Sequence, residues 1–396
     1  MRRNLLHIES LLDGTGFEES PGAMLLEGDS IVQVGTPQSI GTIEDVQITQ
    51  IHGTVTPSFV NAHAHLDLTV ESASSKGMDF MPWVKEVVAP IRMKQTKEDV
   101  QKVVERGVQL SKEGGCFTVG DIAGTTEAMR AFQESDLLGV SFLELIGTGD
   151  RSESAIERMS DLPEGCGVQP HAPYSCSRDV YEAAFDSNRP LATHLAETLD
   201  EVECLKERSG AIVEFAKSIG VWNEDIGHAC VHPVDALCDI ASRPFLAAHC
   251  QYLEEHHYEL LCKAGVSVVY CPRASAFFGH RQHPWKTLLE RGVNVALGTD
   301  SLLCLDTPSR MTVLDDMRYL YEQGGDATTL LNMATVNGAR ALGLDESHYQ
   351  FSIGKIAGLN QFEKNENHGF AKVLQSSEMP TAVYGLKNPA SSFLPP

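Results

Sequence analysis

Two histidines placed two positions apart in an apolar run are the most chemically informative feature of this 396-residue sequence. His63 and His65 lie in the run of residues 60–66, and its apolar composition predicts a buried β-strand. Side chains two apart on a strand point to the same face, so both imidazoles can reach one ion from a rigid backbone. Burying them requires a partner that offsets the cost, and a metal is the simplest such partner.

Three further metal-type ligands follow later apolar runs of the chain. These are His194, His249 and Asp300. Neutral imidazoles together with a carboxylate suit Zn²⁺ or Fe²⁺. The run that ends in Gln169-Pro170-His171 has no lysine that would bridge a second ion. We therefore predict a hydrolytic centre with one divalent metal, Zn²⁺ in the first instance and Fe²⁺ as the alternative.

The residues beside these ligands predict a division of labour around one water molecule. A bound metal lowers the pKa of its water toward ~7. We expect His249 to hydrogen-bond that water, and Asp300 both to contact the metal and to accept the water proton. Glu197 follows His194 by three residues and has two interpretations. It completes a helix N-terminal cap, or it is a general acid that protonates a ring nitrogen, a role worth roughly 10²–10⁴-fold. We predict the catalytic role.

Four other positions are candidates for substrate contact. His171 either caps its strand or hydrogen-bonds the substrate, and we predict the latter. The connection over residues 68–94 is long for a loop between strand and helix, so Trp83 and its neighbours either cover a flat ring or form a short helix against the core. Arg273 binds a substrate carboxylate or pairs with a surface acid, and Phe278 offers a stacking surface.

Eight apolar runs alternate with helical patterns, which predicts a (β/α)8 barrel over residues 54–349. In such barrels the chemistry lies where the strands end, so the candidate residues should converge there. The predicted strands lie near 59–65, 116–121, 140–146, 166–171, 191–196, 245–250, 266–271 and 294–299. The predicted helices include 98–112, closed by Gly114-Gly115, and two that follow the last strand, 308–322 and 328–342.

The chain termini predict a second, smaller unit. Residues 23–35 have the pattern of a hairpin that turns at Gly28-Asp29, and residues 354–359 can return to those strands. We therefore assign residues 1–53 and 350–396 to a small discontinuous β domain. Residues beyond 376 are rich in Ser, Pro and Ala, and we expect loose order there.

Composition excludes several classes of partner. The formal net charge is -23, and such a surface repels nucleic-acid phosphates and anionic membranes. No run reaches the ~18 apolar residues that a membrane span needs. The ten cysteines form no Cys-x-x-Cys pair, and the N-terminus carries no apolar signal segment. We expect a cytoplasmic enzyme with a small-molecule substrate, and a homodimer is one assembly that the sequence leaves open.

Together these motifs resemble the amidohydrolase superfamily, in particular its cytosine/guanine deaminase and chlorohydrolase-like branch. The resemblance covers roughly residues 11–362 and rests on five segments, at 57–65, 171–175, 194–198, 249–250 and 298–301. It implies a barrel with a β-sandwich built from both termini. It also implies that His63, His65, His194 and Asp300 bind the metal, that Glu197 and His249 are catalytic and that His171 contacts the substrate.

Within that branch, residues 271–273 and 278–280 are similar to those of relatives that deaminate adenine-type nucleosides, such as aminodeoxyfutalosine and methylthioadenosine/S-adenosylhomocysteine deaminases. The predicted reaction is release of ammonia from an aminated heteroaromatic ring. The alternatives are removal of chloride or an alkylamine from a triazine-like ring, or deamination of guanine, cytosine or a pterin. A scaffold without catalytic activity is disfavoured because every predicted ligand is present.

Overall fold

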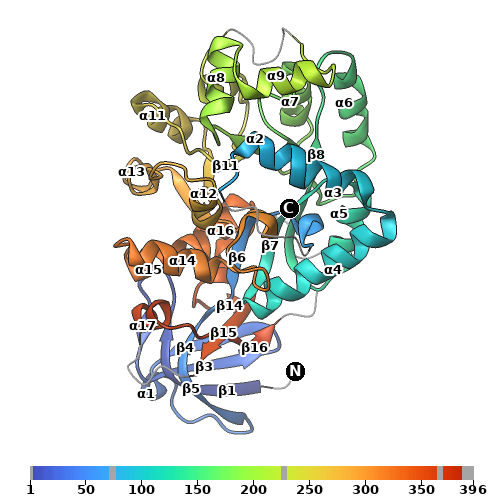
Figure 1. Cartoon of the computed structure of the whole chain (residues 1–396). Coiled ribbons are helices and arrows are strands. Elements are labelled where there is room, and N and C mark those ends of the chain that lie inside the picture. Colours follow the sequence, from blue (N-terminus) through green and yellow to red (C-terminus); the bar gives the residue numbers. More distant parts are fainter. Residues whose placement is uncertain (1–2, 71–76, 224–229, 364–368, 386–396) are drawn as a thin grey trace.

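The computed structural model describes residues 3–70, 77–223, 230–363 and 369–385. Its larger part is a barrel of eight parallel strands surrounded by helices (Figure 1). Two four-stranded parallel sheets make up the barrel. They are joined by bridges between Val168 and Leu191 and between Ala64 and Asp300. The strands are β6 (Phe59–Ala64), β7 (Cys116–Ala123), β8 (Leu138–Leu145), β9 (Gly167–Pro170), β10 (Ala192–Leu195), β11 (Leu246–His249), β12 (Ser267–Tyr270) and β13 (Asn294–Leu297).

All eight predicted barrel strands are confirmed, and nearly every residue in them is buried. Parallel strands that are covered on both faces have continuous apolar sequences. For this reason the apolar runs were enough to identify the barrel strands. The helices of the barrel are α4 (Lys97–Glu113), α5 (Thr126–Gln133), α6 (Ser152–Ser160), α7 (Arg178–Asp186), α8 (Leu199–Glu207), α9 (Ala211–Ser218), α10 (Pro233–Ile240), α11 (Glu255–Lys263), α12 (Pro272–Phe277), α13 (Trp285–Glu290), α14 (Val313–Glu322), α15 (Ala327–Met333) and α16 (Val336–Ala341).

Helix α4 illustrates how the sequence sets an element's limits. A capping box between Thr96 and Asp99 begins it. Its buried positions include Val100, Val104 and Val108, which share one face. Gly114 caps its C-terminus, as predicted.

The second unit is a small β domain made from both ends of the chain, as predicted; Figure 1 shows its strands in blue and red at the bottom of the view. The hairpin of β3 and β4 turns at Gly28-Asp29 as expected. The strands join into one continuous sheet, and β5 continues past residue 53 to Pro57. Its strands are β1 (Arg3–Leu12), β2 (Glu18–Glu19), β3 (Gly22–Glu27), β4 (Ser30–Gly35), β5 (Gln47–Pro57), β14 (Gly354–Lys355), β15 (Gly358–Phe362) and β16 (Thr381–Gly385), with α1 (Pro37–Ile40) beside them and α17 (Phe370–Gln375) between β15 and β16.

Three expectations about the C-terminal third need correction. The helix predicted over 308–322 begins only at Val313, because the side chain of Thr312 caps it there. The helix predicted over 328–342 is two helices, α15 and α16, with a break at Ala334-Thr335 that apolar spacing does not reveal. Residues 381–385 form a strand that pairs with β15, so the loose order expected beyond 376 is wrong for these residues, and the rest of that expectation, over 386–396, lies outside the described residues.

The connection over residues 68–94 is helical where it is described. It comprises α2 (Phe80–Trp83), a π-helical segment (Val84–Val88) and α3 (Ala89–Lys94). In Figure 1 this segment crosses the end of the barrel that lies away from the small β domain. Among the described residues, no helix has the length and apolar character to cross a membrane.

Candidate metal centre and active site

The predicted ligands meet at the C-terminal end of the barrel. His63 lies near the end of β6 and His65 directly after it, His194 is on β10, and His249 ends β11. Asp300 follows β13, where its backbone N–H donates to the carbonyl of His63 (3.0 Å). The parallel barrel therefore brings together residues that are up to 237 positions apart (300 − 63).

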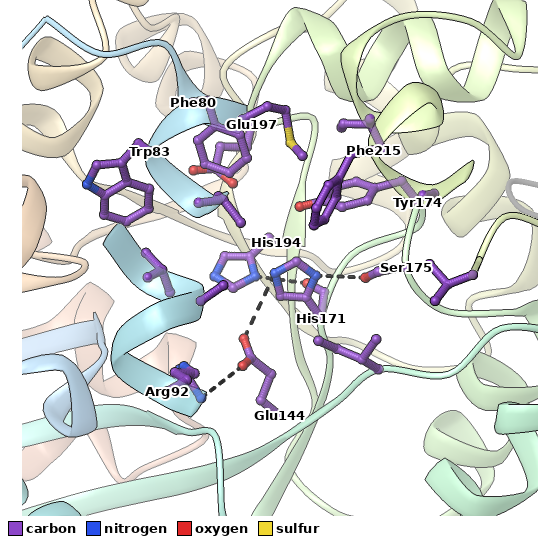
Figure 2. A pocket seen from close by; sticks show the side chains of 18 of the residues that line it. Phe80, Trp83, Arg92, Glu144, His171, Tyr174, Ser175, His194, Glu197 and Phe215 are labelled. Atoms are coloured by element: carbon purple, nitrogen blue, oxygen red, sulfur yellow. Dashed lines mark hydrogen bonds and ion pairs between the residues drawn. The ribbon is translucent and has the colours of Figure 1, made fainter. Parts of the chain in front are cut away.

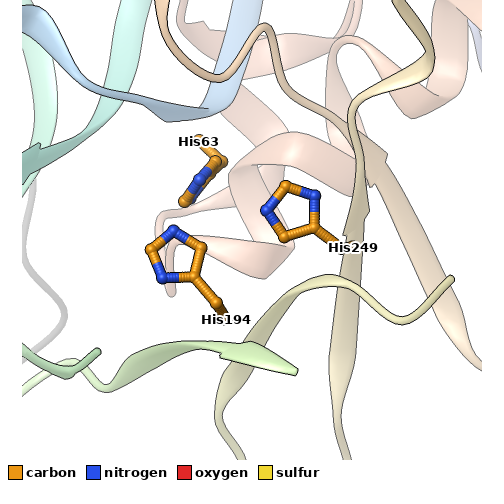
Figure 3. Close-up of side chains that lie close together, drawn as sticks. All are labelled: His63, His194 and His249. Carbon is orange, nitrogen blue, oxygen red and sulfur yellow. The ribbon is translucent and has the colours of Figure 1, made fainter. Parts of the chain in front are cut away.

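Their side chains converge on one point. His65 Nε2 lies 3.5 Å and His63 Nε2 3.9 Å from Oδ1 of Asp300. The ring of His63 lies 5.0 Å from that of His194 and 5.5 Å from that of His249, centroid to centroid. Figure 3 shows these last three rings facing a common centre.

The geometry of this cluster fits one metal ion. Four ligands at ~2.0–2.1 Å in a tetrahedron lie about 3.3 Å from one another, close to the separations from Asp300. Both ring nitrogens of His63 and Nε2 of His249 are buried without a hydrogen-bond partner among the described residues. Polar atoms left in that state are rare and costly, and an ion with its bound water at the centre of the cluster would give them partners.

The electrostatics of the cluster also suit metal binding, because its imidazoles are neutral. Burial lowers the pKa of His63 and of His65 well below the usual value, and His194 lowers both further. His194 donates from Nδ1 to the carbonyl of His171 (2.9 Å). In a neutral ring that bond leaves Nε2 unprotonated, and such a carbonyl contact commonly orients a metal-binding histidine.

Several of these residues are held in unusual backbone conformations. His249 has φ +71° and Asp300 has φ +60°, while Ala196, beside Glu197, has φ +48°. Left-handed conformations are uncommon for residues other than glycine and cluster at functional sites. The structure stabilises them locally: His283 donates from Nε2 to the carbonyl of His249 (2.7 Å).

Glu197 is brought to the same centre. Its Oε1 lies 3.6 Å from Nε2 of His249, and its side chain lines the cavity that opens from this centre, which we call the main cavity. Burial raises the pKa of this carboxyl well above its usual value, and the neighbouring charges of Asp300 and Glu201 raise it further. Glu197 is thus able to carry a proton where most carboxyl groups have lost theirs.

A cavity of about 420 Å³ opens from this centre and is lined by residues of the strand ends and of α2, α3 and α9. The volume lies within the range of small-molecule sites. Figure 2 shows His171 and His194 at its base, with Phe80, Tyr174 and Phe215 above them. His171 contacts Ser175 through Nδ1 (2.7 Å) and lies 4.0 Å from Glu144 through Nε2. Burial lowers the pKa of His171.

The aromatic candidates form one cluster beside the metal centre. Trp83 lines the main cavity, and its ring lies 5.1 Å from that of Phe278. Phe278 does not line that cavity. It lines a small adjoining pocket together with Glu197, His249 and Asp300. The two interpretations of the 68–94 connection are therefore compatible, because a helical segment packs on the barrel and also covers the cavity.

The substrate role expected for Arg273 is corrected by its position. Its guanidinium is buried, contacts Asp306 and Thr307, and lies 4.0 Å from Asp316. It lines neither the main cavity nor the adjoining pocket. Its contacts agree with the alternative expectation, in which Arg273 pairs with acidic side chains.

The sequence did not predict the two charged side chains that meet beside His171. Glu144 lies near the end of β8, and Arg92 of α3 lies 3.4 Å from it and 3.1 Å from Asp67; Figure 2 shows the first of these pairs. Burial acts to raise the pKa of Glu144, but the positive charges around it, led by Arg92 and His171, together outweigh burial, so the pKa is lowered. The position of Glu144, a carboxylate at the end of a predicted apolar strand, could have marked it as a site residue. Nothing in the sequence indicated that Arg92 would pair with it.

Comparisons with known proteins agree with this architecture. A family model described as the amidohydrolase family matches residues 54–389. Two relatives are named 5-methylthioadenosine/S-adenosylhomocysteine deaminase. The one from Pyrococcus abyssi is 26% identical over 84% of this chain and 79% of its own length. The one from Syntrophobacter fumaroxidans is 29% identical over 90% of this chain and 84% of its own length. The Helicobacter pylori aminofutalosine deaminase structure, in complex with methylthio-coformycin, has a TM-score of 0.82 at 20% identity and covers 97% of this chain and 99% of its own. The chain belongs to the amidohydrolase family.

Proposed function

We propose that this protein is a mononuclear metal-dependent deaminase that releases ammonia from an adenine-type nucleoside. The observation that carries the proposal is the position of the buried Glu197 carboxyl, whose Oε1 lies 3.6 Å from Nε2 of His249 and beside the candidate metal ligands. Burial also raises the pKa of this carboxyl well above its usual value, which favours a proton donor. The names of the relatives from Pyrococcus abyssi and Syntrophobacter fumaroxidans support the same reaction class.

His63, His65, His194 and Asp300 would hold the ion, for which Zn²⁺ is the first candidate. Three imidazoles with a carboxylate are typical zinc ligands. When bound, the metal supplies Lewis-acid activation of a water molecule at neutral pH.

The chain's own residues then move protons. Glu197 donates its proton to the ring nitrogen next to the amine-bearing carbon, which makes that carbon electrophilic. Asp300 accepts a proton from the attacking water and passes it to the departing amine, while His249 orients the water. The C–O bond forms first and the C–N bond then breaks. The remaining hydroxyl proton passes back to Glu197, so the ring gains a carbonyl group, ammonia leaves and Glu197 is ready for another turnover.

The cavity supports a flat heteroaromatic substrate. Trp83 and Phe80 offer aromatic faces, and His171 and Glu144 place polar atoms near the base of the cavity. Aromatic side chains stack favourably on such rings.

An ammonia-release assay tests the proposal. The zinc-loaded protein is offered methylthioadenosine, S-adenosylhomocysteine and adenosine, alongside guanine, cytosine, a pterin and a chlorotriazine. We expect the highest kcat/KM for ammonia release to belong to a member of the first group. Release of chloride or alkylamine in preference to ammonia would contradict the proposal and favour the triazine-type alternative.

A further inference from the structure

The side of the cavity formed by α9 and by the segments after β8 and α9 is walled by apolar side chains, of which Ile146 and Ile219 are half-exposed. We call it the outer chamber and define it by Ile146, Ile212, Phe215, Ala216, Ile219 and Val221. Four of these belong to α9 and the residue that caps it, and the others to the segments after β8 and α9. On the opposite wall the π-helical segment contributes Val84 and Val88. The outer chamber thus offers mainly dispersion contacts and water exclusion.

Exposed apolar side chains gather at the same cavity. Six large hydrophobic residues are exposed among the described residues, and three of them line it: Met93, Ile146 and Ile219, which are 85%, 51% and 53% exposed. Scattered exposed apolar side chains are normal, but a group at one opening marks a binding surface.

Among the described residues that line the cavity, the Arg, Lys, Asp and Glu side chains outside the candidate metal centre are Arg92, Glu144 and Arg151. Glu144 is held by Arg92 at the base. Arg151 is exposed and donates to the hydroxyl of Thr148 (3.4 Å). An exposed guanidinium contributes little to the binding of a charged group, whereas the apolar wall penalises one that is buried without a partner.

We infer that the substrate carries an uncharged, apolar substituent (alkyl, alkylthio or aryl) that extends from the aminated ring into the outer chamber. This inference rests on the proposed function, since it places the ring at the metal centre. The inference narrows the proposed substrates to those with an apolar substituent. A substituent that ends in a carboxylate or an amino-acid group would place a charge against the apolar wall of the chamber.

A matched series of adenines tests the inference. The probes are 9-methyladenine, 9-hexyladenine and 9-(5-carboxypentyl)adenine, of which the last two have chains of equal length. Ammonia release should show kcat/KM rising about fourfold for each buried methylene, and the carboxylate should abolish that gain. Equal kcat/KM for the hexyl and carboxypentyl probes, or a preference for the carboxylate, would overturn the inference.

Two matched substitutions locate the effect in the chamber. Ile219→Ala shortens a half-exposed wall residue, and Ile353→Ala shortens an isoleucine that is 76% exposed and does not line the cavity. We expect Ile219→Ala to lower the ratio of kcat/KM for the hexyl and methyl probes about three- to tenfold, and Ile353→Ala to leave the ratio unchanged. Equal ratios in the two variants would overturn the inference.

Calorimetric binding of 9-hexylhypoxanthine and 9-(5-carboxypentyl)hypoxanthine separates this inference from the proposed function. If no adenine releases ammonia, the proposed function fails. Tighter binding of the hexyl compound that weakens in Ile219→Ala would still support the apolar chamber, whereas equal binding of the two compounds would overturn it.

Discussion

Replacing Glu201 by Gln should weaken the turn that presents Glu197. The Glu201 side chain is fully buried at the start of α8. One carboxylate oxygen accepts from the backbone N–H of Ala196 (3.1 Å) and the other from that of Glu197 (2.9 Å). Because Ala196 is left-handed, these two bonds hold a turn that its backbone does not favour.

The size of the expected loss of folding free energy follows from those two hydrogen bonds. Gln supplies one acceptor oxygen and places an amide group against the second N–H, so at least one buried donor loses its partner. That loss costs about 1–3 kcal/mol of folding free energy. Burial raises the pKa of Glu201 to about 7, so the neutral amide also relieves a desolvation cost at alkaline pH. We therefore expect a net loss of about 1–2 kcal/mol at pH 8.

Activity should fall by more than stability suggests, because a misplacement of about 1 Å at a reacting group can cost ~10²-fold. Urea unfolding, kcat and metal content of Glu201→Gln are compared with those of Glu207→Gln, an exposed position on the same helix. Metal content should stay unchanged, because Glu201 does not contact the metal ligands. If Glu201→Gln matches the control in both stability and kcat, the positioning role of Glu201 is refuted.

Three other predictions follow from buried charges and from the metal centre. At pH 8, where Asp316 is ionised although burial raises its pKa to about 7, Arg273→Ala should cost about 3–5 kcal/mol of stability, because it leaves this buried carboxylate without its cation. KM should stay unchanged, and a selective rise in KM would instead favour substrate binding. Burial raises the pKa of Asp121 to about 7, so the wild type should lose stability relative to Asp121→Asn as pH rises from about 4 to about 7, where only the unfolded chain releases the proton; denaturation at several pH values checks this, and a parallel profile would contradict it. Chelation should abolish activity and lower Tm, since a ligand at 100 times its Kd adds ~2.7 kcal/mol, and Zn²⁺ should restore both; full activity without metal would contradict the metal assignment.

Local pattern was enough to predict the barrel and to bring the candidate ligands to one end of it. The strands are buried on both faces, so their apolar composition is continuous, and His63 and His65 are polar exceptions in such a run. Because parallel strands end at one edge, strand position alone brought His194, His249 and Asp300 together. The convergence of the candidate metal ligands was therefore the most predictable part of the site.

Features that depend on long-range contacts escaped prediction. Arg92 meets Glu144 only because α3 crosses the end of the barrel, and the two residues are 52 positions apart (144 − 92). Arg273 lay next to aromatic candidates in the sequence, yet its side chain contacts Asp306, Thr307 and Asp316 rather than the cavity. The break between α15 and α16 is likewise invisible to apolar spacing.

The central claim is that Glu197 protonates the substrate beside a metal-activated water, and Glu197→Gln tests it most directly. The substitution preserves size and leaves the metal ligands intact, so the variant should bind one metal per chain as the wild type does. We expect ammonia release from methylthioadenosine to fall by about 10²–10⁴-fold in kcat. A metal-loaded Glu197→Gln protein with wild-type kcat would contradict the account.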